Sequence, residues 1–250
     1  MIDNTGAEFM RKTRYQYISP SPQSLDVPQP PLEAEPPAGA ELIILPAPDS
    51  LPAYPIDLRQ VIEQRRSLRA YANTPLTLEE FTFLVWCTAG VQEVFPNRTL
   101  RTVASAGARH SLDPYILVNR VEGVAPGLYR YYALRHALYA VSLAEDINAR
   151  LTAACRMQPQ VRDSAATFFW VGVQERMYWR YVERGYRYIH LDAGHICQNL
   201  YLAAEAINCG VCGIAAFDDD LVNEAIGVDG ETEFIVYLAS LGKRKPKPAA

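Results

Sequence analysis

The sequence contains no long hydrophobic run. A membrane-spanning helix needs about eighteen or more apolar residues in succession, and no such stretch occurs in the 250 residues. The first residues, MIDNTGAEFMRKTRYQY, also lack the apolar segment of a signal peptide. We therefore expect a cytoplasmic protein that does not act in a membrane.

Cysteine is scarce and odd in number. The five cysteines lie in apolar segments, which favours buried free thiols over a disulfide framework. Cys209 and Cys212 form a C-x-x-C pattern, which can be a redox pair or half of a zinc site. No second pair and no suitably spaced histidines accompany it. The favoured interpretation is packing of small side chains, and no metal site is predicted.

There is no excess of basic residues. The 24 lysines and arginines are outnumbered by 28 acidic residues, and the net charge of -4 gives no general attraction to nucleic acid. Residues 176–187, RMYWRYVERGYR, interleave aromatic and basic side chains as some nucleic-acid-binding segments do. Their aromatic residues recur at near-helical spacing, which favours a packed helix with solvated arginines. No nucleic-acid partner is expected.

Several common catalytic signatures are also absent. The sequence has no GxxxxGK[ST], no GxGxxG after a strand, no GxSxG and no HExxH. These absences exclude the nucleotide-binding, hydrolase and zinc-protease classes that are easiest to identify from sequence.

The residues from Tyr186 to Gly213 are the most informative segment. From Leu191 to Ile207 a helix would be apolar around most of its circumference, which predicts a long helix in the core. Asp192, His195 and Asn199 would share one stripe of this helix, and His195 is most simply a hydrogen-bonded core residue. Gly210 and Gly213 are predicted to end the helix and to open the loop GIAAF, the first candidate site.

Proline dominates the N-terminal part of the chain. Eleven of the eighteen prolines lie between Pro20 and Pro55, so this arm is predicted to be neither helix nor central strand. A disordered tail and an arm that docks on the body are both open, and the apolar run ELIILP at residues 41–46 favours docking. We divide the chain into an arm (1–55), a main domain (56–245) and a C-terminal tail (246–250).

The main domain mixes helices and strands without a βαβ repeat. Helices are predicted from Asp57, after Thr77 as N-cap, from Leu143 to Cys155, over 176–187 and after FDDD. Strands rich in aromatic and β-branched residues are predicted in PYILVNRV, GLYRYYALRHALYAVS, ATFFWVGVQE and ETEFIVYLASLG. Residues 91–113 show no clear period. The pattern indicates an α+β fold in which helices cover a sheet.

The small-residue turn from Ala104 to Ala108 is the second candidate site, and a basic turn is a further candidate. Arg65 and Arg69 are four residues apart with Ser67 between them, so a compact turn could direct all three side chains at one phosphate. The alternative is a solvated helix end. A second cation cluster near Lys243 and the small-residue turn from Ala104 to Ala108 favour the phosphate site.

These segments together resemble the FMN-dependent nitroreductase family, and within it the SagB-type dehydrogenase branch. RRSLRAY resembles the family's phosphate-binding turn, and SAGARH resembles its small-residue turn. GYRYIHLDAGHICQNLYLAAEAINCGVCGIAAFDDD resembles its central helix and following loop, while QPPLE and IILPAP resemble the SagB-type N-terminal segment. The resemblance implies a mostly antiparallel sheet covered by helices, a long buried helix and an intertwined homodimer.

The resemblance also implies a set of cofactor-binding residues. The FMN phosphate, ribityl chain and pyrimidine edge would be held by Arg65, Ser67 and Arg69, with Arg66 contributing backbone. The ring would be covered from the other subunit by Ser105, Gly107 and Ala108, and its N5 side would face the backbone N–H groups of Ala215 and Ala216. The phosphate clamp would be completed by Lys243, with Arg244 as a further candidate.

The implied activity is oxidation of an azoline-like heterocycle in a peptide by an FMN enzyme. Such a reaction needs a base, and Tyr186, Tyr188 and His190 are candidates by type and place. Ala104 and Ala108 depart from the proline and asparagine that are common in nitroreductases, which makes a nitroaromatic substrate less secure. An NAD(P)H-dependent nitroreductase acting on nitroaromatics or quinones and a non-catalytic flavin-binding protein remain the alternatives.

Overall fold

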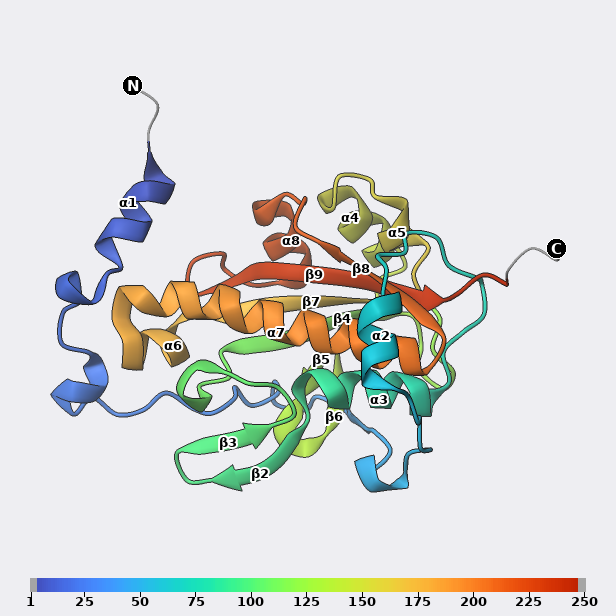
Figure 1. Ribbon diagram of the computed structural model, residues 1–250, viewed down its shortest axis with the longest axis horizontal. Coiled ribbons are helices and arrows are strands. Elements are labelled where there is room, and N and C mark those ends of the chain that lie inside the picture. Colours follow the sequence, from blue (N-terminus) through green and yellow to red (C-terminus); the bar gives the residue numbers. More distant parts are fainter. Residues whose placement is uncertain (1–3, 247–250) are drawn as a thin grey trace.

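Every strand of the main sheet runs antiparallel to its neighbours. The computed structural model describes residues 4–246, and its seven-stranded sheet has the order β1-β6-β5-β4-β7-β9-β8 (Figure 1). The strands are β1 (Leu42–Ile44), β4 (Leu112–Val118), β5 (Gly127–Tyr132), β6 (Ala137–Ser142), β7 (Ala166–Val173), β8 (Cys209–Ile214) and β9 (Glu233–Lys243). The predicted α+β fold with a mostly antiparallel sheet is confirmed.

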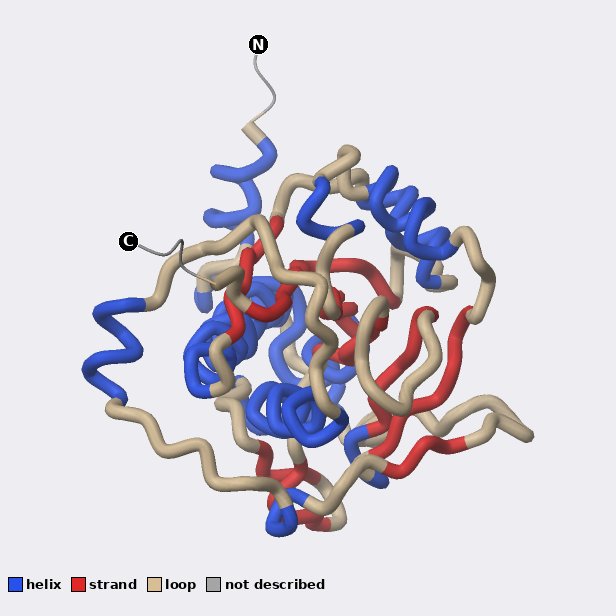
Figure 2. The backbone as a smooth tube through the Cα atoms, turned by 90° about the vertical axis from the view of Figure 1, so that its right-hand side faces the viewer, coloured by secondary structure: helices blue, strands red, loops and turns tan. Residues whose placement is uncertain are grey.

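Helices cover both faces of this sheet (Figures 1 and 2). The 22-residue helix α7 (Gly185–Ala206) crosses one face and contacts α2 (Leu58–Gln64), α3 (Leu78–Ala89) and α6 (Gln174–Tyr181). The opposite face carries α4 (Ile147–Ala154), α5 (Pro159–Arg162) and α8 (Asp219–Ile226). The predicted long central helix is therefore confirmed.

The central strand β7 contributes to a core on each face. Phe168 and Trp170 pack in the core beneath α7, whereas Phe169 and Val171 pack in the core beneath α4 and α8. Successive side chains of a strand point to opposite faces, so a strand buried on both faces is apolar at every position. The run ATFFWVGV, in which Thr167 is the polar exception, is explained by this double burial.

The predicted N-cap of α3 is present as a full capping box. The Thr77 hydroxyl accepts from the backbone N–H of Glu80 at 3.2 Å, and the Glu80 carboxylate accepts from the N–H of Thr77 at 3.1 Å. Each side chain satisfies an N–H group that the first helical turn leaves unpaired. The start of α3, and with it one wall beside α7, is fixed by local sequence.

The N-terminal arm lies along the body over much of its length. Its residues 42–44 form β1, which pairs with β6 at one edge of the sheet, as a proline-rich segment can do. Glu33 is buried, and its carboxylate accepts from the backbone N–H groups of Ala133 and Leu134 at 3.0 Å each. The first helix, α1 (Thr5–Lys12), buries no residue and stands off the body (Figure 1).

The predicted loop at Gly210 and Gly213 is wrong, because both glycines belong to β8. A Cβ atom at Gly210 would collide with Leu68, and one at Gly213 would collide with the Tyr237 hydroxyl. The glycines therefore serve close packing of neighbouring chain segments on the strand rather than helix termination. The free loop begins only at Ala215.

One segment has more regular structure than its sequence indicated, and one further expectation fails. Residues 91–113, for which no period was evident, include a hairpin of β2 (Val91–Phe95) and β3 (Arg98–Arg101). His195 is exposed on the surface of α7 and is therefore not a core residue. Of the predicted tail 246–250, residues 247–250 lie outside the described part of the chain.

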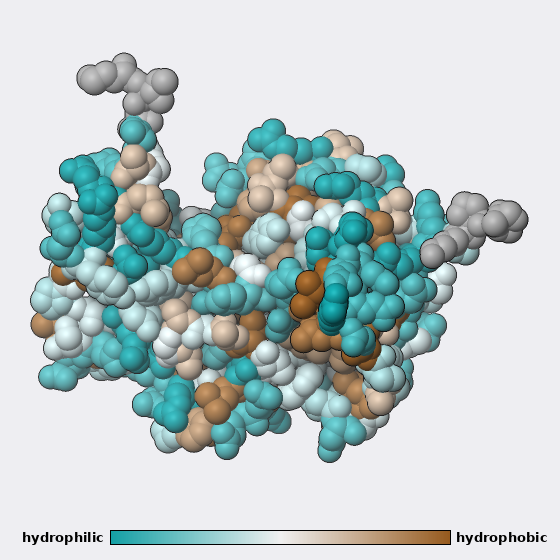
Figure 3. Space-filling model, viewed as in Figure 1, coloured by the Kyte–Doolittle hydropathy of each residue, from teal (hydrophilic) through white to brown (hydrophobic). Residues whose placement is uncertain are grey.

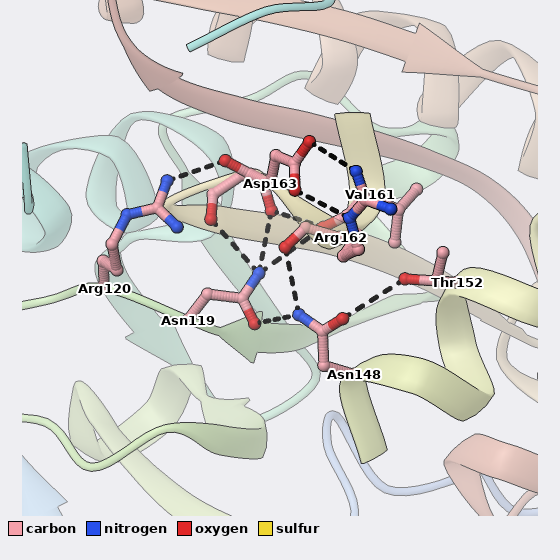
Figure 4. A network of polar contacts seen from close by, with 8 residues as sticks. Asn119, Arg120, Asn148, Thr152, Val161, Arg162 and Asp163 are labelled. Atoms are coloured by element: carbon pink, nitrogen blue, oxygen red, sulfur yellow. Dashed lines mark hydrogen bonds and ion pairs between the residues drawn. The ribbon is translucent and has the colours of Figure 1, made fainter. Parts of the chain in front are cut away.

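A polar network fixes α4 and α5 to the end of β4 (Figure 4). The Asn119 amide donates to the carbonyl of Ser164 at 3.2 Å and accepts from Asn148 at 2.6 Å. Arg120 donates to the carbonyl of Asp163 at 2.7 Å. These contacts stabilise the face of the sheet opposite α7.

Within residues 4–246, no helix combines the length and the apolar character that crossing a bilayer requires.

In the space-filling view, most of the face that carries α7 is hydrophilic, with apolar patches beside α2 (Figure 3). A groove of about 330 Å³ opens there between the segment 54–61, α3 and the C-terminal half of α7. It is lined mainly by apolar side chains, among them Tyr54, Phe83, Trp86, Leu202 and Ala203.

Candidate functional site

The basic turn from Arg65 to Arg69, called the arginine turn from here on, lies along the outer edge of β8. Ser67 forms a parallel bridge with Val211, and the Leu68 N–H donates to the Val211 carbonyl at 2.9 Å. The Ser67 and Tyr201 hydroxyls are 2.9 Å apart, and the Arg65 guanidinium lies 5.0 Å from the centre of the Tyr201 ring. The turn is thus held between β8 and the C-terminal half of α7.

Tyr201 connects these three elements. Besides Ser67, its hydroxyl accepts from the backbone N–H of Gly213 in β8 at 2.8 Å. No sequence pattern indicated this role, because an aromatic residue in an apolar helix is expected in the core. Only the position of β8 beside α7 makes Tyr201 part of the site.

The turn carries positive charge that is not neutralised by the protein. Among residues 4–246, no carboxylate lies within salt-bridge distance of Arg65, Arg66 or Arg69. Arg66 donates to the carbonyls of Glu63 and Arg65, at 2.9 and 2.8 Å, and so closes the end of α2. Arg69 lies against the Cys212 thiol, and burial raises the pKa of that thiol.

The two C-terminal cations, by contrast, have acidic partners. The Lys243 ammonium pairs with Glu80 and donates to the carbonyl of Ile207 at 3.0 Å. Arg244 pairs with Glu205 and donates to the carbonyl of Cys209 at 3.2 Å. Their charge is therefore largely balanced, whereas the charge of Arg65 and Arg69 is not.

Ala215 and Ala216 follow β8 directly and are exposed. The carbonyl of Ala216 accepts from the Gln158 amide at 2.8 Å. In the described part of the chain, no group accepts from the backbone N–H of either alanine. These two donors are available to a ligand just beyond the C-terminal end of β8, four residues along the chain from Val211, where the arginine turn bridges the strand.

The small-residue turn contacts a different part of α7. The Ser105 hydroxyl donates to the Asp192 carboxylate at 2.6 Å, and the Ala106 N–H donates to its other oxygen at 3.2 Å. Gly107 is exposed, and a side chain there would collide with Arg180 and Tyr181. Tyr181 is a further neighbour of the turn that no sequence spacing indicated.

The arginine turn and the small-residue turn, which we call the two candidate half-sites, contact opposite sides of α7. Tyr201, beside the arginine turn, follows Asp192, beside the small-residue turn, by nine positions in α7. Nine residues are two and a half helical turns and about 13 Å along the axis. One chain therefore does not place the arginine turn and the small-residue turn against the same small ring.

The nitroreductase family model matches residues 62–243, which contain both half-sites, α7 and β8. The chain belongs to the nitroreductase family. A relative of known sequence is the Methanocaldococcus jannaschii protein MJ1384, which carries the name of a nitroreductase. It is 32% identical over 189 residues, which are 76% of this chain and 92% of that protein.

A second relative of this nitroreductase-family chain is the trifolitoxin-processing protein TfxB of Rhizobium leguminosarum bv. trifolii. It is 29% identical over 133 residues, which are 52% of this chain and 36% of TfxB. The resemblance to the nitroreductase family is thus confirmed, and a relative named for the processing of trifolitoxin is consistent with its SagB-type branch.

Solved structures confirm the nitroreductase-like fold. The Escherichia coli microcin synthetase McbBCD complex contains a chain with a TM-score of 0.58 and 18% identity, covering 97% of this chain and 92% of that one. A Desulfovibrio desulfuricans protein in complex with FMN has a TM-score of 0.54 and 16% identity, covering 78% and 91%. At these identities the likeness shows the fold alone. The family as a whole consists of flavin oxidoreductases.

The three candidate bases divide between two sides of α7. Tyr186 and His190 are four residues apart and share a side: Tyr186 stacks on Phe234 of β9, and His190 Nδ1 lies 2.7 Å from the Tyr186 carbonyl. Tyr188 points the other way and meets Tyr181 edge to face at 4.8 Å. Burial raises the pKa of both Tyr186 and Tyr188. Tyr188 is the candidate on the side of the small-residue turn.

Proposed function

We propose that this nitroreductase-family chain is an FMN-dependent dehydrogenase of the SagB type, which oxidises an azoline-like heterocycle in a peptide. The observation that carries the proposal is the set of unpaired donors beside the middle of β8 and just beyond its C-terminal end. Arg65 and Arg69 have no acidic partner in the described chain, and the N–H groups of Ala215 and Ala216 have no acceptor. The similarity to TfxB supports a peptide as the substrate.

The chemistry of these donors fits FMN. A phosphate prefers guanidinium groups that are free to form charge-assisted hydrogen bonds, which describes Arg65 and Arg69. The N–H groups of Ala215 and Ala216 would face the polar edge of the flavin ring and stabilise negative charge there. The bound flavin would supply the hydride acceptor, while the protein binds and orients both it and the substrate.

Lys243 and Arg244 have a smaller place in this proposal. Each would have to leave a carboxylate, Glu80 or Glu205, before binding a phosphate directly. We therefore assign the principal phosphate contacts to Arg65 and Arg69, and to Ser67 through its exposed hydroxyl. The two C-terminal cations would add a longer-range positive potential.

A homodimer would complete the site. If the small-residue turn of a second chain covers the ring bound at the arginine turn, the two-fold axis passes near the midpoint between the two turns. That midpoint lies beside residues 194–198 of α7, where Gly194, His195 and Gln198 are exposed. Gly194 has open space around it, and the nearby Leu191 is 59% exposed. An exposed, partly apolar side of a core helix is typical of a subunit interface.

For the proton that leaves carbon, we propose Tyr188 as the first of the three candidates. It lies on the side of α7 that faces Tyr181 and the small-residue turn. Its hydroxyl is hydrogen-bonded to Tyr15 at 2.9 Å and accepts from Arg184 at 2.8 Å, so its position is fixed. Tyr186 and His190 lie on the opposite side and would serve only if the substrate reaches around the helix.

A reductase of nitroaromatics or quinones is the second candidate function, favoured by the similarity to MJ1384 over 92% of that protein. Anaerobic stopped-flow absorbance distinguishes the two. The purified protein, loaded with FMN, is mixed with an azoline-containing peptide, with NADH or with NADPH. Bleaching by the azoline peptide supports the dehydrogenase. Rapid bleaching by a nicotinamide, followed by rapid nitro reduction and no response to azolines, would support the reductase, and a flavin inert to all three would support a non-catalytic flavoprotein.

A further inference from the structure

The turn from Ser105 to His110 has an uncommon backbone. Gly107, Ala108 and His110 adopt positive φ angles of 58°, 53° and 43°. Left-handed conformations are rare for residues with a side chain and persist where surrounding contacts hold them. Two residues with a side chain, Ala108 and His110, adopt this conformation within three positions, which requires an anchor outside the turn.

Asp192 of α7 provides this anchor. Its carboxylate accepts from the Ser105 hydroxyl at 2.6 Å and from the Ala106 N–H at 3.2 Å. The Ser105 oxygen in turn accepts from the backbone N–H of His110 at 2.9 Å. Asp192 therefore holds the start of the turn directly and the end of the turn through Ser105.

The Asp192 carboxylate is reserved for this purpose. The residue is only 4% exposed, and no lysine or arginine among residues 4–246 lies within salt-bridge distance of it. Burial raises its pKa, while the bonds from Ser105 and Ala106 act in the opposite direction. Burying a carboxylate without a neighbouring cation costs free energy unless hydrogen bonds to the carboxylate offset that cost.

The same contacts occupy the Ser105 side chain. A serine hydroxyl has one proton, and here that proton is donated to Asp192. One of its lone pairs accepts from the N–H of His110. A hydrogen bond from Ser105 to a flavin would have to replace the bond to the carboxylate, whereas Gly107 and Ala108 can meet a ring without any such exchange.

We infer that Asp192 is a positioning residue of the flavin site, and that Ser105 acts through Asp192 rather than by contact with the cofactor. The inference rests on the proposed function only in placing FMN against the turn. It changes the expected role of Ser105, whose hydroxyl becomes part of the anchor. The surface presented to the ring is then the backbone of the turn together with Gly107 and Ala108.

A double-mutant cycle on FMN affinity tests the inference. Ser105→Ala, Asp192→Asn and the double variant are titrated with FMN by fluorescence. Each single change should weaken binding about tenfold, and the double variant should be no weaker than the weaker single variant, since both break one anchor. A loss of about a hundredfold in the double variant would mean that Ser105 contacts the flavin independently, which overturns the inference. Asp146→Asn, at an exposed aspartate beside α4 whose side chain caps nothing, is the matched control.

Hydrogen exchange of the flavin-free protein gives a second readout. In Asp192→Asn, the amides of Ala106 and His110 should exchange at least about tenfold faster, because the turn opens locally. The amides of Ile196 and Leu200 in α7 should not change, which separates local opening from unfolding. Unchanged exchange at Ala106 and His110 would refute the positioning role. If the wild-type protein binds no FMN, the proposed function fails, and the exchange data alone decide the role of Asp192.

Discussion

The phenolic oxygens of Tyr15 and Tyr188 lie 2.9 Å apart, although 173 positions separate the residues in the chain. Arg184 joins the pair by stacking on the Tyr15 ring at 4.3 Å and by donating to the Tyr188 oxygen at 2.8 Å. The hydrogen bond from Tyr188 and the nearby Arg184 charge hold the pKa of Tyr15 below its usual value. Burial and the bond to Tyr15 raise the pKa of Tyr188. The hydrogen bond from the N-terminal arm thus adds to the effect of burial in raising the pKa of a candidate catalytic residue.

Tyr15→Phe should lower the pKa of Tyr188. The change removes an acceptor that favours the protonated phenol, while Arg184, which favours the phenolate, remains. NMR titration with ¹³C-labelled tyrosine measures this pKa. Tyr17→Phe, at an exposed residue of the same arm, should leave it unchanged. An unaltered Tyr188 titration in Tyr15→Phe would show that the arm does not influence this residue.

Asp113→Asn should destabilise the fold by about 3–5 kcal/mol, because it leaves two buried arginines without their counter-charge. Arg176 donates to Asp113 at 2.6 and 3.0 Å, and Arg130 also pairs with it. Urea denaturation measures the difference. Asp163→Asn, which removes an exposed pair with Arg162, should cost no more than about 1 kcal/mol. Equal effects would mean that the buried cluster contributes no more than a surface pair.

The contribution of Asp113 should depend on pH. Burial alone would raise its pKa, but Arg176 and Arg130 outweigh burial and hold the pKa at about 2, below the ordinary 3.8. The depressed pKa means that the stabilisation is complete above pH 4 and is lost as the pH falls toward 2. Denaturation of the wild type and of Asp113→Asn across this range should show their stabilities converge as acid is added.

Arg65→Ala and Arg69→Ala should each weaken FMN binding about tenfold to a hundredfold, since a charge-assisted bond to phosphate contributes about 1.5–3 kcal/mol. Riboflavin, which lacks the phosphate, should bind both variants as it binds the wild type. Arg150→Ala, on the opposite face of the sheet, is the matched control. Arg180 is unsuitable as a control, because it lies against Gly107. Parallel losses of riboflavin and FMN would place the arginines away from the phosphate.

His195→Glu should dissociate the proposed homodimer, because it brings two like charges close to the two-fold axis. Sedimentation velocity measures the oligomeric state, and the monomer should lose FMN even though Arg65 and Arg69 are intact. Ala153→Glu introduces the same charge on exposed α4, far from α7, and should leave the dimer unchanged. A wild-type protein that is monomeric and holds FMN tightly would rule out a site shared between chains.

Features of the fold and site could be predicted from the sequence where they depend only on residues that are neighbours along the chain. Thr77 and Glu80 form their capping box within a single helical turn. Arg65 and Ser67 lie close together because only one residue separates them in the sequence. Gly210 and Gly213 misled the prediction, since glycine is common at helix ends. Their reason is the proximity of Leu68 and Tyr237, which come from distant segments.

The rest of the candidate site depends on contacts between segments that no local spacing encodes. Ser105 and Asp192 are 87 positions apart, and Tyr201 gains its role only when β8 lies beside α7. The exposure of His195 likewise follows from which side of α7 faces the sheet. An apolar sequence on all sides of a helix does not distinguish a core from a core plus a subunit interface.

Helix α7 also sets the distance between the two candidate half-sites. Because Asp192 and Tyr201 fix one turn each, the segment between them sets both the separation and the relative orientation of the two half-sites. Inserting or deleting a single residue there would rotate one half-site against the other by about 100° and shift it by about 1.5 Å. The loop after Gly227 does not connect the two turns and carries no such constraint. Length changes should therefore be tolerated in this loop and not among the eight residues, 193–200, that connect the two turns.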